Sequence, residues 1–144
     1  MTWALETAAR TLAQEARGEP LEGQQAVAYC LKNRVADGRW GKNLASVCLW
    51  RAQFSGWYSP RGNPPVQDPN FAYACNLADD DPTLSHMCSV IQAALDSDAD
   101  PTDGALFYYA LSMDPPPAWA ASMRKCGTFG HQIFLSDKPA APMV

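Results

Sequence analysis

Two apolar helical patterns separated by a short break constrain the fold of this chain more than any other feature. Over residues 3–16, apolar side chains recur at steps of three and four, and Glu15 falls at the margin of the face that they form. Gly18 and Pro20 interrupt this spacing. The sequence therefore predicts one helix over residues 3–16 and a second over 20–36, joined by a tight turn.

An acidic side chain in the last turn of a buried helix has the environment of a general acid. Glu15 is held by the core at this position and is partly removed from water, which favours the protonated form of a carboxyl group. A proton retained near neutrality can be donated to the oxygen of a glycosidic bond. Arg34, at the edge of the apolar face of the second helix, should have an acidic partner, and Glu15 and Glu19 are the candidates.

The remaining patterns predict shorter helices and a small sheet. The expected helical segments lie at residues 43–49, 70–79 and 82–96. Two aromatic runs, at 105–109 and 128–135, predict strands that pair in antiparallel, with a proline-rich loop between them that could rim a cleft. The fold class is therefore α+β and mainly helical. We expect a single domain over residues 1–144, with its core at about 3–136 and a loose tail at 137–144.

The charge balance excludes some partners and is unevenly distributed. The net charge of −4 argues against a nucleic-acid-binding protein. Residues 1–66 carry eight Lys/Arg and five Asp/Glu, whereas residues 67–144 carry three and ten. The basic part contains Glu15 and would suit an anionic polymer, although two solvated faces would give the same pattern.

The sequence gives no sign of a membrane segment or a leader. No apolar run approaches the roughly 20 residues that span a bilayer. The first residues lack the basic and apolar segments of a signal peptide. We therefore expect synthesis in the cytoplasm and no stable insertion into a membrane.

The five cysteines include no C-x-x-C pair. Cys30 lies on an apolar helix face and is expected in the core. A disulfide, for example between Cys75 and Cys88, could form in an oxidising compartment. A zinc site from Cys75, His86, Cys88 and His131 matches no standard spacing, so no metal or other cofactor is predicted.

Several motifs occur in an order that resembles one family of enzymes. The run from Ala13 to Ala28 contains Glu15-Ala16-Arg17-Gly18-Glu19 and is followed by Asn33-Arg34-Val35. The later motifs are Gln53-Phe54-Ser55, Asp100-Pro101-Thr102, Gly104 to Tyr109, Trp119, and Gly130 to Phe134. Over roughly residues 4–135 this set resembles the SleB-type spore-cortex-lytic and cell-wall hydrolase family. The sequence lacks the peptidoglycan-binding repeat domain that the spore members usually carry.

The resemblance implies a fold and an activity. The fold would be lysozyme-like. The enzyme would act as a lytic transglycosylase on peptidoglycan glycan strands, cutting between N-acetylmuramic acid and N-acetylglucosamine, with Glu15 as the catalytic acid and base. The expected protein is a monomer. With no leader in the sequence, it would reach the wall after release, as a bacteriophage endolysin does.

The resemblance also suggests which side chains surround the substrate. Amides and aromatic rings between residues 50 and 70 have the composition of a sugar-binding wall, although a packed surface loop is the alternative. Tyr108 and Tyr109 alternate along a strand, so only one of them should face the cleft. The residues expected to bind substrate are Gln53, Phe54, Ser55, Trp57, Tyr108, Tyr109, Trp119 and His131. The residues expected to have structural roles near the site are Glu19, Asn33 and Arg34.

Three other functions are compatible with parts of the pattern. A hydrolytic muramidase would use the same bond but needs a second carboxylate. A cysteine peptidase could use Cys126 and His131, although such partners usually come from distant segments. A glycan-binding or virion module would keep the fold without cleaving anything.

Overall fold

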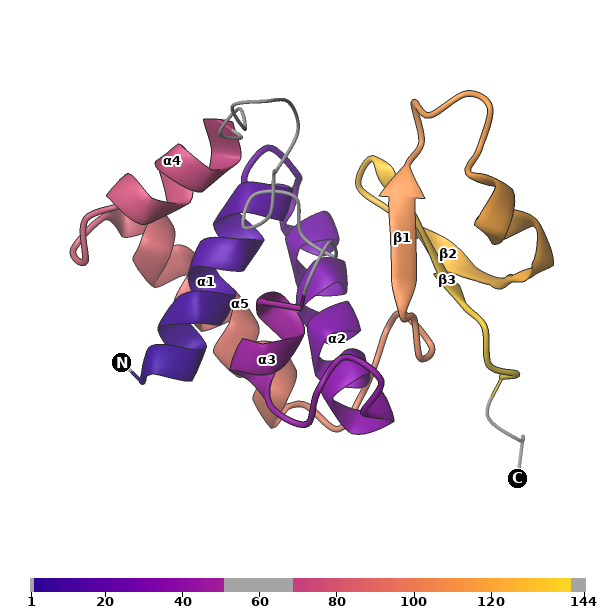
Figure 1. Ribbon diagram of the computed structural model, residues 1–144, viewed down its shortest axis with the longest axis horizontal. Coiled ribbons are helices and arrows are strands. Elements are labelled where there is room, and N and C mark those ends of the chain that lie inside the picture. Colours follow the sequence, from indigo (N-terminus) through magenta and orange to yellow (C-terminus); the bar gives the residue numbers. More distant parts are fainter. Residues whose placement is uncertain (1, 51–68, 141–144) are drawn as a thin grey trace, which may run out of the picture.

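In the computed structural model, which describes residues 2–50 and 69–140, a group of helices faces a small antiparallel sheet (Figure 1). The helices are α1 (Trp3–Ala16), α2 (Leu21–Asp37), α3 (Leu44–Cys48), α4 (Pro69–Asn76) and α5 (Pro82–Asp96). The strands are β1 (Phe107–Ala110), β2 (Arg124–Phe129) and β3 (Gln132–Ser136), with a short 3₁₀ helix, η1 (Ala118–Ser122), before β2. The predicted fold class, α+β and mainly helical, is confirmed.

The helix α1 begins and ends where its sequence predicts. The hydroxyl of Thr2 accepts a hydrogen bond of 3.2 Å from the backbone N–H of Leu5, which caps the first turn. The buried face of α1 consists largely of small residues, so neighbouring helices approach it closely. Its fully buried residues include Ala8, Ala9, Leu12 and Ala13. The helix α1 therefore lies at the centre of the helical layer, in contact with α2, α3, α4 and α5.

The three strands form a sheet in the order β1-β3-β2. The prediction of one strand over residues 128–135 is wrong, because this segment contains the β2–β3 hairpin. The chain turns at Gly130, which has a φ of +59°. A Cβ atom at this position would come within 3.1 Å of Pro20 Cδ, so the hairpin can pack against the start of α2 only with glycine there.

The two faces of the sheet have different roles. Phe134 is fully buried on the face that meets the helices, where its ring contacts Tyr108 and Phe129 at centroid distances of 5.3 and 5.6 Å. On the other face, Tyr109 and Leu135 form a second, smaller apolar cluster with η1. In Figure 1, η1 lies on the side of the sheet away from the helices. The sheet therefore separates a large core from a small one.

The residues after β3 are anchored to the end of α2, so the predicted loose tail does not begin at residue 137. Asp137 accepts hydrogen bonds from Arg39, and the Lys138 amine lies 2.5 Å from the carboxylate of Asp37. Hydrogen bonds from Arg39 and Lys138 hold the pKa of Asp37 well below its ordinary value, although burial opposes this shift. Residues 141–144 lie outside the described chain.

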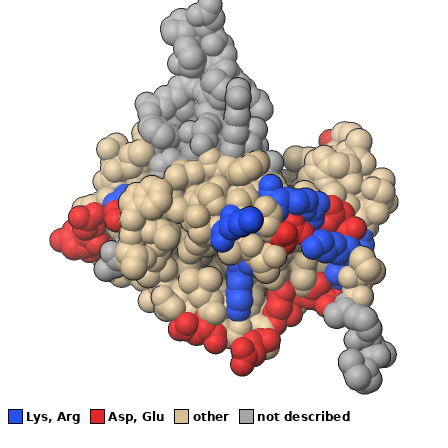
Figure 2. Space-filling model, turned by 60° about the horizontal axis from the view of Figure 1, so that its bottom comes forward, with Lys and Arg blue, Asp and Glu red and all other residues tan. Residues whose placement is uncertain are grey.

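Two arginines of the first half of the sequence are paired with acids. Arg10 contacts Glu6 and Asp79, and Arg39 contacts Asp37 and Asp137. Figure 2 shows basic (blue) and acidic (red) side chains lying next to one another at the right of the view. The uneven charge of the sequence thus becomes a mixed surface there. Within the described part of the chain, no helix combines the length and the apolar character needed to cross a bilayer.

Candidate active site

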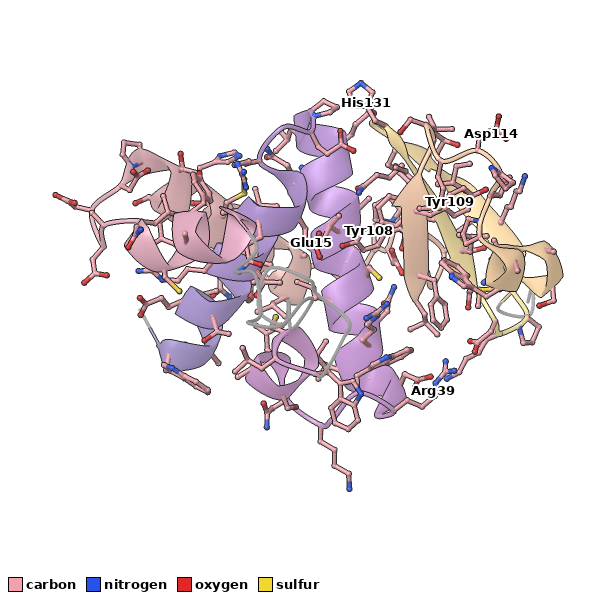
Figure 3. All side chains as sticks on the ribbon, turned by 45° about the horizontal axis from the view of Figure 1, so that its top comes forward. Glu15, Arg39, Tyr108, Tyr109, Asp114 and His131 are labelled. Carbon is pink, nitrogen blue, oxygen red and sulfur yellow. The ribbon has the colours of Figure 1, made fainter. Side chains whose placement is uncertain are left out.

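Glu15 occupies the position that the sequence predicts, in the last turn of α1. Its neighbours Leu12 and Ala16 are buried in the helical core, and they hold the backbone at this point. The Glu15 side chain itself is half-buried. Figure 3 shows it at the side of the helical layer that meets the sheet, next to Tyr108 of β1. The end of α1 therefore presents a carboxyl group to the sheet.

Tyr108, and not Tyr109, is the tyrosine of β1 that lies beside Glu15. Its ring packs on Phe134 within the core between sheet and helices. Burial raises the pKa of Tyr108 well above its ordinary value, and the negative charge of Glu15 raises it further. The phenol therefore remains protonated over the physiological range and can act as a hydrogen-bond donor. Strand alternation alone leaves Tyr108 and Tyr109 as equal candidates for the side of Glu15. The packing of the Tyr108 ring on Phe134 places Tyr108 on that side.

Arg34 ties α2 to the start of β1. The residue is only 5% exposed. Its Nε atom donates a hydrogen bond of 2.8 Å to the carbonyl oxygen of Leu106, and its guanidinium lies 4.5 Å from the ring centroid of Trp40. Arg34 is also close enough to lower the pKa of the buried Cys30 thiol, although burial dominates and raises that pKa to about 11. Arg34 thus holds the strand that carries Tyr108.

The predicted pairing of Arg34 with Glu19 is wrong. Glu19 precedes the first turn of α2 and Arg34 lies in its last turns, so the two are about 20 Å apart along the helix axis. Glu19 instead contacts His131 in the β2–β3 hairpin, with a distance of 2.6 Å between Glu19 Oε2 and His131 Nδ1. The backbone N–H of His131 donates a second bond of 3.2 Å to Glu19 Oε1.

The Glu19–His131 contact joins the α1–α2 turn to the hairpin. The Glu19 side chain is only 10% exposed, whereas that of His131 is 77% exposed. A Cβ atom on Gly23 would lie 3.1 Å from Glu19 Cβ, so the first turn of α2 packs closely against the aliphatic part of the Glu19 side chain. Because the same turn follows Glu15 directly, the contact fixes the hairpin relative to the catalytic candidate. His131 was predicted to bind substrate or pair with an acid, and the structure shows the acid pair.

Glu19→Gln should lower thermal stability more than it lowers turnover. The amide keeps the shape but loses the charge-assisted bonds to His131, and the exposure of His131 limits the cost to about 1 kcal/mol. A drop of roughly 3–5 °C in Tm is expected, with kcat within about threefold of wild type. Thermal unfolding and sacculus turnover measure the two quantities. Glu22→Gln, at an exposed carboxylate of the same region, is the matched control. An unchanged Tm with collapsed activity would make Glu19 catalytic instead.

Asn33 organises the turn that leads into β1. Its amide nitrogen donates to Asp100 Oδ2 at 2.9 Å and to the carbonyl oxygen of Ala105 at 3.1 Å. Asp100 also accepts hydrogen bonds from the backbone N–H groups of Thr102 and Gly104. Burial alone would raise the pKa of Asp100, but these bonds outweigh it and lower the pKa. The Asp-x-Thr spacing is typical of such a side-chain-closed turn, a signal from which this role could have been predicted.

Several predicted substrate residues are not placed beside Glu15. Tyr109 and Trp119 contact each other at 6.1 Å on the opposite face of β1, where Trp119 is 44% exposed. Trp119, a residue of η1, therefore packs on the face of the sheet away from Glu15. Four other residues of the predicted wall lie outside the described residues: Gln53, Phe54, Ser55 and Trp57.

The arrangement gives no support to the cysteine-based alternatives. Burial raises the pKa of Cys126, and the acidic charge of Asp103 adds to that shift, so the thiol is not activated as a nucleophile. The ring of His131 faces Glu19. All five cysteines are free thiols, including Cys75 and Cys88. Among the described residues, no three His, Cys, Asp or Glu side chains are grouped to share a metal ion.

Comparison with known proteins identifies the fold and the family. The family model described as Cell Wall Hydrolase matches residues 18–135, beginning just after Glu15. The catalytic domain of the germination-specific lytic transglycosylase SleB from Bacillus anthracis superimposes with a TM-score of 0.69 at 21% identity, covering 94% of this chain and 97% of that chain. The catalytic domain of the Bacillus cereus SleB protein gives a TM-score of 0.65 at 22% identity, covering 92% and 89%. No curated protein sequence matches the chain.

The helical layer and the small antiparallel sheet define a lysozyme-like α+β domain with the fold of the SleB catalytic domains. Since the family model covers most of the sequence, the assignment rests on more than the shared fold. The chain belongs to the cell wall hydrolase family.

Proposed function

We propose that this protein cleaves the β-1,4 bond between N-acetylmuramic acid and N-acetylglucosamine in peptidoglycan, as a lytic transglycosylase with Glu15 as its single acid and base. The observation that carries the proposal is the position of Glu15, half-buried at the end of α1 with the protonated phenol of Tyr108 beside it. Family membership supports a wall substrate, and the similar SleB domain from Bacillus anthracis is itself named a lytic transglycosylase.

Three other carboxylates that are at least partly buried already have structural partners, which favours a mechanism with one acid. A hydrolase of the ordinary kind needs a second carboxylate roughly 5–10 Å from the first. Glu19 is bound to His131, Asp37 to Arg39 and Lys138, and Asp100 to Asn33 and its own turn. These carboxylates are held by structural contacts. A lytic transglycosylase uses no activated water, because the attacking group is a hydroxyl of the substrate itself. It therefore needs no second carboxylate.

In the proposed reaction the same carboxyl group acts twice. Protonated Glu15 donates its proton to the bridging oxygen as the glycosidic bond breaks. The C6 hydroxyl of the muramoyl sugar then attacks the electron-poor C1, and ionised Glu15 takes the hydroxyl proton. The carboxyl group is thereby restored to its starting form. The product carries a 1,6-anhydro ring, and no water is consumed.

Tyr108 is the group best placed to assist Glu15. Among the described residues its hydroxyl has no hydrogen-bond partner, so its proton is available to a substrate oxygen or to the Glu15 carboxylate formed during the reaction. A donor in a site shielded from water stabilises developing negative charge more than a donor in solution. Tyr108 would therefore favour the step in which Glu15 is ionised.

Tyr108→Phe should reduce kcat by about tenfold, because it removes one hydrogen-bond donor while keeping the ring packed on Phe134. Tyr109→Phe makes the same chemical change on the opposite face of the strand and should leave kcat within about twofold. Turnover of purified sacculi under saturating conditions measures both. Equal effects of the two substitutions would show that Tyr108 has no special place in the reaction.

Mass spectrometry of the muropeptides released from purified sacculi tests the reaction itself. Anhydromuropeptides are the expected products. Reducing-end muramic acid would establish a muramidase, and free stem peptides would establish a peptidase. Binding to sacculi without release of any soluble product would show that the protein is a glycan-binding module, and it would overturn the proposed activity.

We further propose that the protein acts on the wall as a monomer, after release from the cytoplasm in the manner of a phage endolysin. The support is the resemblance of its motifs to wall hydrolases and its family membership. Size-exclusion chromatography with light scattering tests the monomer, and a stable dimer would contradict it.

A further inference from the structure

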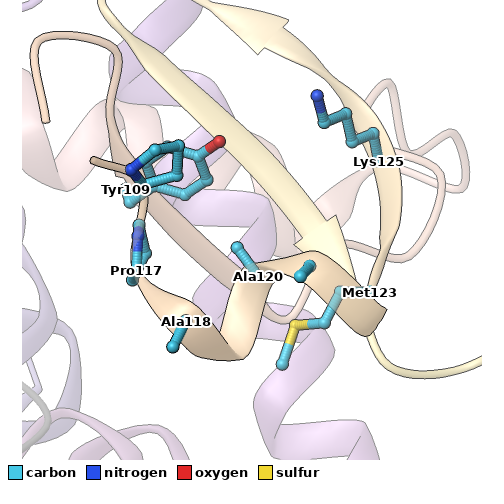
Figure 4. A pocket seen from close by; sticks show the side chains of 8 residues that line it. Tyr109, Pro117, Ala118, Ala120, Met123 and Lys125 are labelled. Atoms are coloured by element: carbon cyan, nitrogen blue, oxygen red, sulfur yellow. The ribbon is translucent and has the colours of Figure 1, made fainter. Parts of the chain in front are cut away.

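A second concave site lies on the face of the sheet away from Glu15. It is a pocket of about 420 Å³ formed by β1, β2 and the loop through η1 (Figure 4). This volume is within the usual range for sites that bind small molecules or parts of a larger ligand. Its lining includes Tyr109, Pro117, Ala118, Ala120, Met123 and Lys125. The proposed reaction at Glu15 makes no use of these residues.

The pocket is preformed by stiff backbone and small side chains. Pro116 and Pro117 form one wall, and Pro117 has the extended conformation of a polyproline segment, with φ −61° and ψ 140°. The following 3₁₀ turn presents alanines, which leave the space open. Tyr109 is 8% exposed and is held in place by Ala120 and Leu135. Little conformational entropy would therefore be lost at this site when a ligand binds.

Two polar groups enter this otherwise apolar pocket. The pairing of Lys125 with Leu135 places the lysine on the same face of the sheet as Tyr109. Within the described parts of the chain, neither the Lys125 amine nor the Tyr109 hydroxyl has an ion-pair or hydrogen-bond partner. Figure 4 shows both groups in the upper part of the pocket, with Ala120 and Met123 below. The Lys125 amine and the Tyr109 hydroxyl could bind a carboxylate, and the alanines opposite them leave an apolar space about the size of a methyl group. The pocket therefore suits a small ligand that carries both groups.

We infer that this pocket binds the peptide stem of peptidoglycan, with a stem carboxylate at Lys125 and Tyr109 and an alanine methyl group against Ala118 and Ala120. The stem supplies both features, since it combines free carboxylates with alanine side chains. A sugar ring would instead need an open aromatic face, and the ring of Tyr109 is almost fully covered. This inference rests on the proposed function for its choice of substrate.

The stem can reach the pocket from a sugar bound near Glu15. β1 is an edge strand of the described sheet, so no further strand blocks the way around it. A four-residue stem extends about 14 Å, whereas layers packed on a sheet lie about 10 Å apart. The glycan would occupy the side of β1 with Tyr108, and its stem the side with Tyr109. Recognition of the stem would then select the position of cleavage along a glycan strand.

Titration of the ¹⁵N-labelled protein with a synthetic stem tetrapeptide, followed by NMR, tests the inference without relying on catalysis. The amide chemical shifts of Ala118, Ala120 and Lys125 should change as the peptide is added. Lys125→Gln should weaken binding about fivefold, which is the effect of losing one partly exposed charged contact. Ala121→Leu should weaken it at least as much, because Ala121 lines the pocket, is exposed, and can carry a larger side chain that fills the space. Lys42→Gln removes the same charge at another exposed lysine and should change nothing.

Measurements of KM for the same variants on two substrates complete the test. Lys125→Gln should raise KM for stem-bearing sacculi about fivefold and leave KM unchanged for glycan strands stripped of stems by an amidase. Absence of shift changes at the pocket, or equal binding by wild type, Lys125→Gln and Ala121→Leu, would overturn the inference. Glu15→Gln should still bind the tetrapeptide. If wild type binds the stem but cuts neither substrate, the proposed reaction fails and the stem site stands.

Discussion

Glu15→Gln should lower the rate of sacculus cleavage by at least about a hundredfold while the protein stays folded. The amide has the shape of the protonated acid but cannot donate a proton to the glycosidic oxygen, and acid–base catalysis by one side chain is worth at least that factor. The fold should survive because the core around α1 is built by its small apolar face, whereas Glu15 is only half-buried. Release of soluble muropeptides measures the rate, and circular dichroism the fold.

Glu6→Gln provides the matched control for this substitution. It makes the same chemical change on the same helix, at a carboxylate whose described partner is Arg10. The rate of this variant should stay within about twofold of wild type, since Glu6 belongs to a partly buried i,i+4 ion pair that the proposed reaction does not use. A well-folded Glu15→Gln protein that keeps a tenth or more of wild-type activity would rule Glu15 out as the acid.

Phe134→Ala should destabilise the protein by about 3–5 kcal/mol, the usual cost of emptying a fully buried phenylalanine site. Phe134 is the central side chain between the sheet and the helices, and its ring supports both Tyr108 and Phe129. Its removal would therefore leave a cavity directly behind the tyrosine beside Glu15. Urea unfolding followed by circular dichroism measures the loss.

Two further variants separate packing on this face from general damage to β3. Ile133→Ala alters the adjacent residue, which is partly buried on the other face, and should cost no more than about 2 kcal/mol. Phe134→Leu should recover more than half of the loss, because it refills most of the volume. If Phe134→Ala lies within about 1 kcal/mol of wild type, the described packing of the sheet on the helices is incorrect.

The helical half of the fold could be predicted from the sequence because its signals are local. The spacing of apolar residues and the break at Gly18 and Pro20 place the ends of α1 and α2 to within a residue. The same signals locate Glu15 in the last turn of α1. These features depend on neighbours within a few positions along the chain, so one sequence is enough to find them.

The sheet and its contacts could not be predicted in the same way. The sequence pattern predicts one strand where the structure has the β2–β3 hairpin, because the two-residue turn at Gly130 and His131 is flanked on both sides by strand-forming residues. The sequence offers Glu19 as one candidate partner of Arg34, whereas the contact in the structure joins Glu19 to a residue 112 positions away. Strand alternation could narrow the choice to Tyr108 or Tyr109, but only the packing of Phe134 decides between them. Long-range contacts carry no local signal.

The pairing of Glu15 with a tyrosine from β1 also has a consequence during synthesis. The two residues are separated by roughly ninety positions in the chain. At a translation rate of about 5–20 residues per second, α1 is synthesised roughly 5–20 s before β1. Throughout that interval the acidic helix end has no strand to face. If Glu15 is the catalytic acid, we expect a newly made chain to cleave no glycan strand until the last third of the polypeptide has folded back onto the first.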